Sequence, residues 1–277
     1  MYLPDSGLRV PPDDARIWRY LDFTKFVALL SHSSLHLSRA DTFLDRFEVS
    51  IPLRDLAAAR TWTIEQMRRR SISRDGIIGY LSALSDQPAT AIAKLSEHEL
   101  VVQFLRHANS ALFVSCWHMN EDESAAMWDL YLGNSPGVAI ESSFAALRDE
   151  LDRATGDTLV TIGAVDYLDY QRDSWGPYRP FNAVFHKRRS FDHERELRAV
   201  IVRPTYDELG SNGNAAAVRH HPAGIDIPIQ LPRLVHRVWI SPRSAPWFAQ
   251  LVATVSERLG CPLPLVRSSL YDAPDFS

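Results

Sequence analysis

The sequence predicts an α+β protein, and three observations carry that prediction. Short runs rich in β-formers recur in both halves of the chain, as at 112–119, 137–142 and 196–202. Segments with the apolar spacing of an amphipathic helix separate them. This alternation is too irregular for a TIM barrel or a Rossmann unit, and the sequence contains no glycine-rich dinucleotide or phosphate loop. We therefore expect one α+β domain over residues 1–277, with a mixed or antiparallel central sheet.

The first half of the chain is expected to contain a strand–helix–strand unit followed by helices. Segment 16–40 predicts a short strand, a helix near 23–31 and a second strand at Leu35–Ser38. Residues 55–110 form a mainly helical insertion or subdomain within the domain. Ser96 and Glu99 lie there at the spacing of a capping box, which predicts a helix start.

In the second half, strands and helices are expected to follow each other closely. We expect strands at 112–119, 137–142, 159–170, 196–202, 225–229, 234–240 and 264–269, and helices at 123–133, 144–156 and 245–260, with a further helix leading into 186–190. The glycine- and asparagine-containing segment 211–224 is expected to be a mobile loop.

Composition excludes several classes of protein. With 30 basic and 34 acidic residues the formal net charge is −4, so no global positive field draws the chain to nucleic acid or to a membrane. Two cysteines provide neither a disulfide framework nor a zinc ribbon. No apolar run reaches the length of about 20 residues that spans a bilayer. Because the first residues also lack the pattern of a signal peptide, we expect a cytoplasmic protein.

The stretch HKRRSFDHERELRAVIV, residues 186–202, raises the main functional question. On an extended strand Glu194, Glu196 and Arg198 would share one face. They could form a solvent-exposed charge ladder whose ion pair contributes well under ~1 kcal/mol, or at least one glutamate could be catalytic. The preceding Lys187, Arg188 and Arg189 could contact phosphates or lie at a solvated helix end.

Other candidate groups have ordinary structural interpretations beside the functional ones. Cys116 and His118 could be a nucleophile and its base, although a buried cysteine is usually inert. Trp128 fits a helix face packed in the core. Asp41, Asp45 and Glu48 could bind a cation, but they lack the spacing of a calcium loop and suit turns and caps, while Glu48 could face a cleft. The histidines that could form a metal cluster lack zinc spacing: His193, His220, His221 and His236.

Five separated phrases give the chain a resemblance to a known family. They are IWRYLDFTKFVALLSHSSLHLSRADTFLDRFE, FVSCW, AAMWDLYLGNSPGVAIE, VDYLDY and FHKRRSFDHERELRAVI. In this order they resemble the uncharacterised bacterial family called "domain of unknown function twenty-nine seventy-one", over roughly residues 17 to 270. Some relatives of that family are linked with abortive phage infection, so the resemblance implies a toxin or phage-defence context.

The order of three polar motifs is also similar to the ADP-ribosyltransferase fold, which implies a split sheet and NAD as the substrate. Enzymes of that fold carry an early Arg or His, a central serine-rich strand and a late Glu, in one branch as Glu-x-Glu. Here that order matches Arg19, Ser115 and Glu194-x-Glu196. The central motif reads Ser-Cys-Trp instead of Ser-Thr-Ser, and Arg16 is a competitor for the early arginine.

The resemblance implies a role for each residue. Glu196 would stabilise the oxocarbenium character that develops on the ribose as nicotinamide leaves, and Glu194 would orient or deprotonate the acceptor. Arg19 would grip the pyrophosphate with its planar fork. Tyr20, Trp117 or Phe191 would stack on nicotinamide. The acceptor would be a protein or a nucleic acid, and a partner gene product is possible.

Two other classes of function remain open. A non-catalytic sensor or binding module could recognise a nucleic acid or a phage component through Lys187, Arg188, Arg189, Trp175 and Tyr178. A metal-dependent hydrolase or nuclease could use Asp45, Glu48 and Glu196.

Overall fold

The computed structural model describes residues 1–2, 7–45, 47–69, 72–85, 87–176, 182–203 and 221–273. It is α+β, with a mainly antiparallel central sheet, as the sequence predicts. The strands are β1 Arg16–Asp22, β2 Ser34–Arg39, β3 Leu112–Met119, β4 Gly137–Ser143, β5 Val160–Ala164, β6 Asp166–Leu168, β7 His186–Arg188, β8 Glu196–Val202, β9 Gly224–Pro228, β10 Arg237–Ile240 and β11 Leu265–Arg267. The α-helices are α1 Phe23–His32, α2 Leu56–Arg69, α3 Arg74–Leu84, α4 Ala89–Ile92, α5 Glu97–Ala108, α6 Ala125–Leu132, α7 Phe144–Thr155, α8 Leu231–Leu234 and α9 Pro246–Arg258. Short 3-10 helices are η1 Ala40–Thr42, η2 Leu53–Asp55, η3 Asn109–Ala111, η4 Asn182–Phe185 and η5 Arg189–Glu194.

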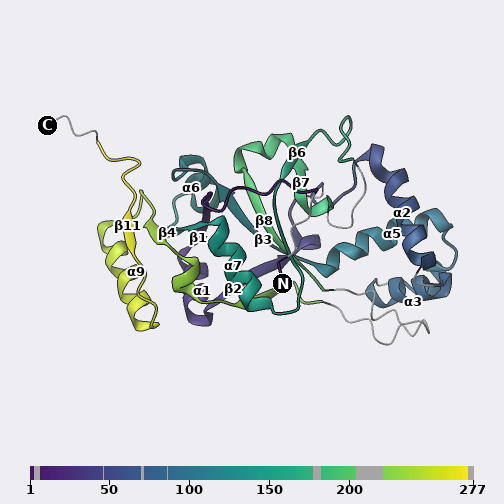
Figure 1. Cartoon of the computed structure of the whole chain (residues 1–277), viewed down its shortest axis with the longest axis horizontal. Helices are drawn as coiled ribbons and strands as arrows, with labels where there is room; N and C mark the ends of the chain where they lie inside the picture. The colour runs from purple at the N-terminus through teal and green to yellow at the C-terminus, as the bar shows by residue number, and fades with distance from the viewer. Residues whose placement is uncertain are drawn as a thin grey trace.

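The central sheet has nine strands and branches at β3. Its main path runs β11-β10-β4-β1-β3-β2-β9, and β8 pairs with both β3 and β5. All pairs in it are antiparallel except β10 with β11. Figure 1 shows the sheet between two groups of helices, with α9 at one end of the molecule and α2, α3 and α5 at the other.

A gap opens in the sheet beside the middle of β3. On one side β8 pairs with β3 over its whole length, from Leu112 to His118. On the other side β2 pairs only with Phe113 and Val114, and β1 only with His118 and Met119. In these ladders residues 115–117 therefore have no strand partner on that side. Beyond the gap β1 continues against β4, and β2 continues against β9.

Both faces of the sheet are covered, so the strands need apolar side chains on both sides. Helices α1, α7 and α9 cover one face, where Ile17 and Leu21 of β1 join the main core. On the opposite face Trp18 and Tyr20 pack against Met127 and other residues of α6. Successive residues of β1 thus enter different cores, as the alternation of a strand requires.

In its described residues, the segment between β2 and β3 contains four α-helices, α2 to α5, with a small core of their own. Tyr80, Leu81, Ile92, Leu100 and Phe104 are buried together there. The start of α5 is fixed by the predicted capping box, because Ser96 Oγ accepts from the Glu99 N–H while the Glu99 carboxylate accepts from the Ser96 N–H.

Most predicted elements are present, but three expectations differ from the structure. The strand expected over 159–170 is two strands, β5 and β6, separated at Val165. The helix expected to lead into 186–190 is wrong, because η4 is a 3-10 helix and the basic run begins on β7. Strand β10 begins at Arg237 because α8 precedes it. Most of the expected loop 211–224, namely 211–220, lies outside the described residues.

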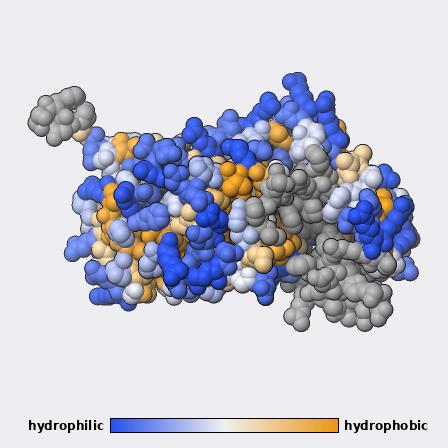
Figure 2. Space-filling view, viewed as in Figure 1, coloured by the Kyte–Doolittle hydropathy of each residue, from blue (hydrophilic) through white to orange (hydrophobic). Residues whose placement is uncertain are grey.

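The visible surface is mixed in polarity. On the face shown in Figure 2 hydrophilic residues predominate, and apolar residues lie between them in patches. Across the parts of the chain that the structure describes, no helix is both long and apolar enough to cross a membrane.

Candidate functional site

A cavity of about 490 Å³ lies at the gap beside β3. Four consecutive residues of β1, Trp18 to Leu21, line it, although they alternate between the two faces of the sheet. From β3 it is lined by Val114 and by Cys116, Trp117 and His118. A volume of this size falls in the range of small-molecule sites. The gap in the sheet is what makes side chains from both faces available to one ligand.

Arg19 reaches across the gap from β1. Its Nη1 donates to Ser115 Oγ on β3 at 3.1 Å, and its Nη2 donates to the backbone oxygen of His36 on β2 at 3.1 Å. No carboxylate within the described residues forms an ion pair with it. Burial lowers the pKa of this guanidinium, although an arginine remains charged in proteins. The cavity wall therefore carries a positive charge without a counter-ion from the described chain.

Ser115 holds this arginine in place. The side chain is buried, and its Oγ accepts from Arg19 and also from Trp117 Nε1 at 3.2 Å. The Arg19 guanidinium lies 5.8 Å from the centre of the Trp117 ring, within the range of a cation–π contact. Ser115 is thus a positioning residue behind the cavity wall, whereas Arg19 and Trp117 line the cavity.

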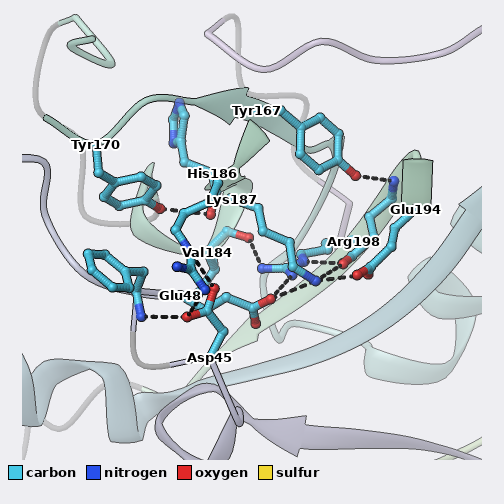
Figure 3. Close-up of polar contacts among 12 residues, drawn as sticks. Asp45, Glu48, Tyr167, Tyr170, Val184, His186, Lys187, Glu194 and Arg198 are labelled. Atoms are coloured by element: carbon cyan, nitrogen blue, oxygen red, sulfur yellow. Dashed lines mark hydrogen bonds and ion pairs between the residues drawn. The ribbon is translucent and has the colours of Figure 1, made fainter. Parts of the chain in front are cut away.

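Glu194 and Glu196 line the cavity and belong to a buried ion cluster (Figure 3). The Lys187 ammonium lies 2.8 Å from Glu194 Oε2, 2.8 Å from Glu196 Oε1 and 2.7 Å from Glu48 Oε1. Arg198 Nε donates to Glu196 Oε2 at 2.6 Å and Arg198 Nη1 donates to the Val184 carbonyl at 2.9 Å. We call Glu48, Lys187, Glu194, Glu196 and Arg198 the ion cluster.

The pKa values of Glu194 and Glu196 are shifted in opposite directions. Burial and a hydrogen bond with Glu196 raise the pKa of Glu194 to about 7. Burial alone would also raise the pKa of Glu196, but Arg198, Glu194 and Lys187 together hold it well below its ordinary value. Glu196 is therefore ionised at neutral pH, while Glu194 binds a proton near neutrality. Such a divergence is common at functional sites.

The sequence-based charge ladder is corrected in two respects. Glu196 and Arg198 do pair on one face of β8, but they are 4% and 1% exposed, so the ladder is buried and not solvent-exposed. Glu194 does not lie on the strand: it ends η5, and the following Arg195 has a left-handed backbone with φ of 40°. This turn, not the alternation of a strand, brings Glu194 to Lys187.

His118 is the cavity residue with the most unusual hydrogen bonding. Its Nδ1 lies 2.6 Å from the backbone oxygen of Glu194, and its Nε2 is buried without a hydrogen-bond partner in the described chain. Burial lowers the pKa of this imidazole. The ring is therefore neutral at physiological pH. Nδ1 carries the proton and donates it to the Glu194 carbonyl oxygen, while the lone pair of Nε2 has no donor within the described chain.

Tyr20 and Cys116 line the cavity but are not reactive groups. The Tyr20 hydroxyl accepts from the Ser124 N–H at 2.8 Å, and its ring stacks on Tyr131 with centres 6.2 Å apart. Burial raises the pKa of the Tyr20 hydroxyl and that of the Cys116 thiol. Cys116 is thus a neutral thiol, which argues against the nucleophile that its spacing from His118 suggested.

The basic run 187–189 is not a free phosphate-binding patch. Lys187 is buried in the ion cluster, Arg188 pairs with Asp45 through Nη2 at 3.0 Å, and Arg189 pairs with Asp173 at 2.7 Å. Each of the three cations thus has a carboxylate partner. The expectation that they lie at a solvated helix end is wrong, because Lys187 and Arg188 are in β7.

Phe191 is also placed differently from the expectation. Its ring lies 4.6 Å from the Lys187 ammonium and 5.3 Å from the Arg188 guanidinium, and it does not line the cavity. The Trp175 ring lies 5.1 Å from the His186 ring at a tilted angle, and neither residue lines the cavity. Tyr178 and His220 lie outside the described residues.

The three acids considered for a cation have other partners. Asp41 pairs with Arg39 at 2.6 Å, Asp45 accepts from the Phe47 N–H and pairs with Arg188, and Glu48 enters the ion cluster. Trp128 of α6 is buried in the core with Trp18 and Tyr20 of β1, as expected. Over the described residues, no group of three or more His, Cys, Asp or Glu side chains is arranged to hold a metal ion.

Sequence reasoning left two features of the site unassigned. Lys187 was grouped with its basic neighbours, since nothing in the local pattern shows that three glutamates surround it. His118 was considered with Cys116 as the base of a nucleophile and with Trp117 and Trp128 for a binding site. Its position opposite Glu196 comes from the register of β3 with β8, which the sequence does not show.

Comparison with known proteins finds no relative of this chain. No protein-family model, no curated protein and no solved structure matches the chain.

Proposed function

We propose that the protein is an ADP-ribosyltransferase-like enzyme that cleaves NAD in the cavity beside β3 and transfers ADP-ribose to an acceptor. The observation that carries the proposal is the distribution of charge around one cavity. Arg19 offers a cation that lacks a carboxylate partner in the described chain, and Glu196 offers an ionised carboxylate.

This pairing of charges matches the charges of NAD during cleavage. The pyrophosphate of NAD is anionic, and an arginine fork binds such oxygens through parallel hydrogen bonds. The ribose becomes positively charged as its bond to nicotinamide breaks, and a fixed carboxylate in a site shielded from water stabilises that charge. Arg19 would therefore hold the phosphates and Glu196 the ribose. Trp117 and Tyr20 add aromatic faces suited to a planar ring.

The gap between β1 and β3 supports the split sheet that the resemblance implies. Arg19 and Ser115 belong to one face of the sheet and Glu196 to the other, so an unbroken sheet would keep them apart. In this proposal the acceptor is a protein or nucleic acid, and the setting is a toxin or phage-defence system. The proposal also includes membership of the family called "domain of unknown function twenty-nine seventy-one". The sensor-module alternative has weaker support because each cation of the basic run 187–189 already has a carboxylate partner.

Nicotinamide release from NAD tests the proposal. Wild-type protein incubated with NAD and candidate acceptors should release nicotinamide, measured by liquid chromatography. We expect Glu196→Gln to slow release by about 100-fold or more, the usual effect of removing a group that stabilises transition-state charge. Glu141→Gln is the matched control, because Glu141 is a buried carboxylate on β4 that accepts from Trp239 Nε1 at 2.7 Å and does not line the cavity.

The controls separate a catalytic effect from damage to the fold. Thermal unfolding of both variants should show a folded protein, and the Glu141 variant should keep the wild-type rate within a few-fold. A folded wild-type protein that neither binds NAD nor releases nicotinamide would refute the proposal. Equal rates for wild type and the Glu196 variant would remove Glu196 from the chemistry.

A further inference from the structure

His118 occupies a special position between the two halves of the site. It is 6% exposed, it is one of the residues that line the cavity, and its Cα partners are Trp18 on β1 and Glu196 on β8. It therefore lies where the gap begins, next to the carboxylate that would hold the ribose.

The tautomer of His118 follows from its hydrogen bond. The Glu194 backbone oxygen can only accept, so the proton of the neutral ring is on Nδ1, which lies 2.6 Å away. Nε2 then carries a lone pair. Orientation of a histidine through an Nδ1–H bond to a backbone carbonyl is a usual way to fix a functional imidazole.

The unsatisfied Nε2 atom requires an explanation. Leaving a buried acceptor without a donor costs about 1–3 kcal/mol, and such groups are rare in folded proteins. Nε2 is buried and has no partner within the described residues, whereas Nδ1 of the same ring is well bonded. A ligand that brings a hydroxyl group to this wall of the cavity would supply the missing donor.

We propose that His118 is the general base that takes the proton of a hydroxyl nucleophile, either water or an alcohol acceptor, as that oxygen attacks the ribose of NAD. This inference rests on the function proposed above. The nucleophile's O–H proton moves to Nε2, and the oxygen lone pair forms a bond to ribose C1′. The bond between C1′ and the nicotinamide nitrogen breaks, and its electron pair stays on neutral nicotinamide. The imidazolium afterwards releases the proton to solvent.

The surroundings of the two side chains make His118 a better candidate for the general base than Glu194. Glu196 is close enough to raise the proton affinity of the ring, while Arg195 and His193 oppose it, and the Tyr20 ring lies 6.3 Å away by ring centres. The Glu194 carboxyl group, in contrast, is tied to Lys187 at 2.8 Å and shares a hydrogen bond with Glu196. Glu194 therefore contributes its backbone oxygen to orient the base.

Kinetics of His118→Asn test the proposal. The asparagine amide can replace Nδ1 and keep the bond to the Glu194 oxygen, but it has no atom at the position of Nε2. We expect nicotinamide release with water or methanol as nucleophile to fall by about 100-fold, a usual contribution of general base catalysis. NAD affinity, measured by calorimetry, should stay within a few-fold of wild type. Methanol distinguishes an alcohol acceptor from water, because it yields O-methyl-ADP-ribose in place of ADP-ribose.

Azide provides the discriminating arm of the experiment, because it is a nucleophile with no proton to lose. Excess azide should restore nicotinamide release in His118→Asn and should not restore it in Glu196→Gln. His107→Asn is the control, because His107 is partly buried in α5 and its pKa is also lowered by burial, but it lies outside the cavity. This control should keep the wild-type rate.

The outcomes separate this inference from the proposed function. A wild-type protein that releases no nicotinamide overturns both. If wild type is active and His118→Asn is equally active, or is slow and not restored by azide, the general base is overturned while the transferase remains. Nitrogen NMR of histidine-labelled wild type gives a readout without any variant: the Nε2 resonance of His118 should move when ADP-ribose binds, because its 1′-hydroxyl occupies the position of the nucleophile. No movement on binding also overturns the inference.

Discussion

Two arginines near the cavity, the half-buried Arg19 of β1 and the buried Arg198 of β8, have opposite surroundings. Arg198 pairs with Glu196 at 2.6 Å and with Glu48 at 3.4 Å, and it also donates to a backbone oxygen. Arg19 contacts only a hydroxyl group, a backbone oxygen and an aromatic ring in the described chain. Both lose hydration on burial, but only Arg198 gains carboxylates in return.

The difference teaches how to distinguish a structural charge from one held for a ligand. A buried cation that is fully paired fixes the fold, and removing its partner leaves a charge that is costly to bury. A cation that is shielded from water without a counter-ion is unfavourable in the folded protein, and an anionic ligand would compensate its charge. The ion cluster joins β7 to β8, and in the proposed function Arg19 is the charge held for an anionic ligand.

Removing Arg198 should give the largest loss of stability. Arg198→Met leaves Glu196 and Glu48 short of a cation in a buried site, so we expect the free energy of unfolding to fall by about 3–5 kcal/mol. Urea denaturation followed by circular dichroism measures it. A loss below about 1 kcal/mol, the value of an exposed pair, would contradict a structural role for the ion cluster.

The second effect is a pH dependence that comes from Glu194. Its pKa is about 7 in the fold against an ordinary 4.5, so the folded protein binds this proton more tightly than the unfolded chain. This stabilisation is fully present below pH 4.5 and is lost as pH rises through 7. Between pH 5 and 8, wild type should therefore lose about 2 kcal/mol relative to Glu194→Gln. Thermal unfolding at several pH values checks this, with exposed Glu257→Gln as control.

A smaller loss is expected for Ser115→Ala. The variant removes the acceptor shared by Arg19 and Trp117, and a buried donor left without a partner costs about 1–2 kcal/mol. Ser256→Ala is a matched control, since Ser256 is equally buried and its Oγ has no partner within the described structure. Equal losses for the two variants in urea denaturation would show that Ser115 does not hold Arg19.

The smallest effect on stability is expected for Arg19→Met. Burial of an uncompensated charge is unfavourable, and this offsets the two hydrogen bonds that the variant loses, so the free energy of unfolding should change by less than about 1 kcal/mol. A loss as large as that of Arg198→Met would contradict the contrast between the two arginines.

The sequence predicted the fold class and most elements because their signals are local. Apolar periodicity, the Ser96–Glu99 capping box and Gly133 after α6 all act within a few residues. Where the helix before 186–190 was wrongly expected, a 3-10 turn and a short strand form instead, and tertiary contacts of Lys187 decide that outcome.

The candidate site was only partly predictable. The order of Arg19, Ser115 and Glu196 in the chain is visible in the sequence, but the gap that lets both faces of the sheet reach one cavity depends on where β1 and β2 leave β3. The burial of Lys187 depends on the left-handed turn at Arg195, and no periodic pattern in the sequence predicts such a turn. The sequence also gives no sign of where the Phe191 ring lies. It was predicted to stack on nicotinamide, whereas it contacts Lys187 and Arg188 of β7.

The most direct test of the account is calorimetric titration of ADP-ribose into wild type and Arg19→Met. ADP-ribose contains the pyrophosphate but is not cleaved by loss of nicotinamide, so binding is measured apart from turnover. We expect wild type to bind it and the variant, still folded, to bind at least about tenfold more weakly, a difference of about 1.4 kcal/mol. No binding to wild type, or equal affinity in both proteins, would contradict the claim that Arg19 is held for an anionic ligand.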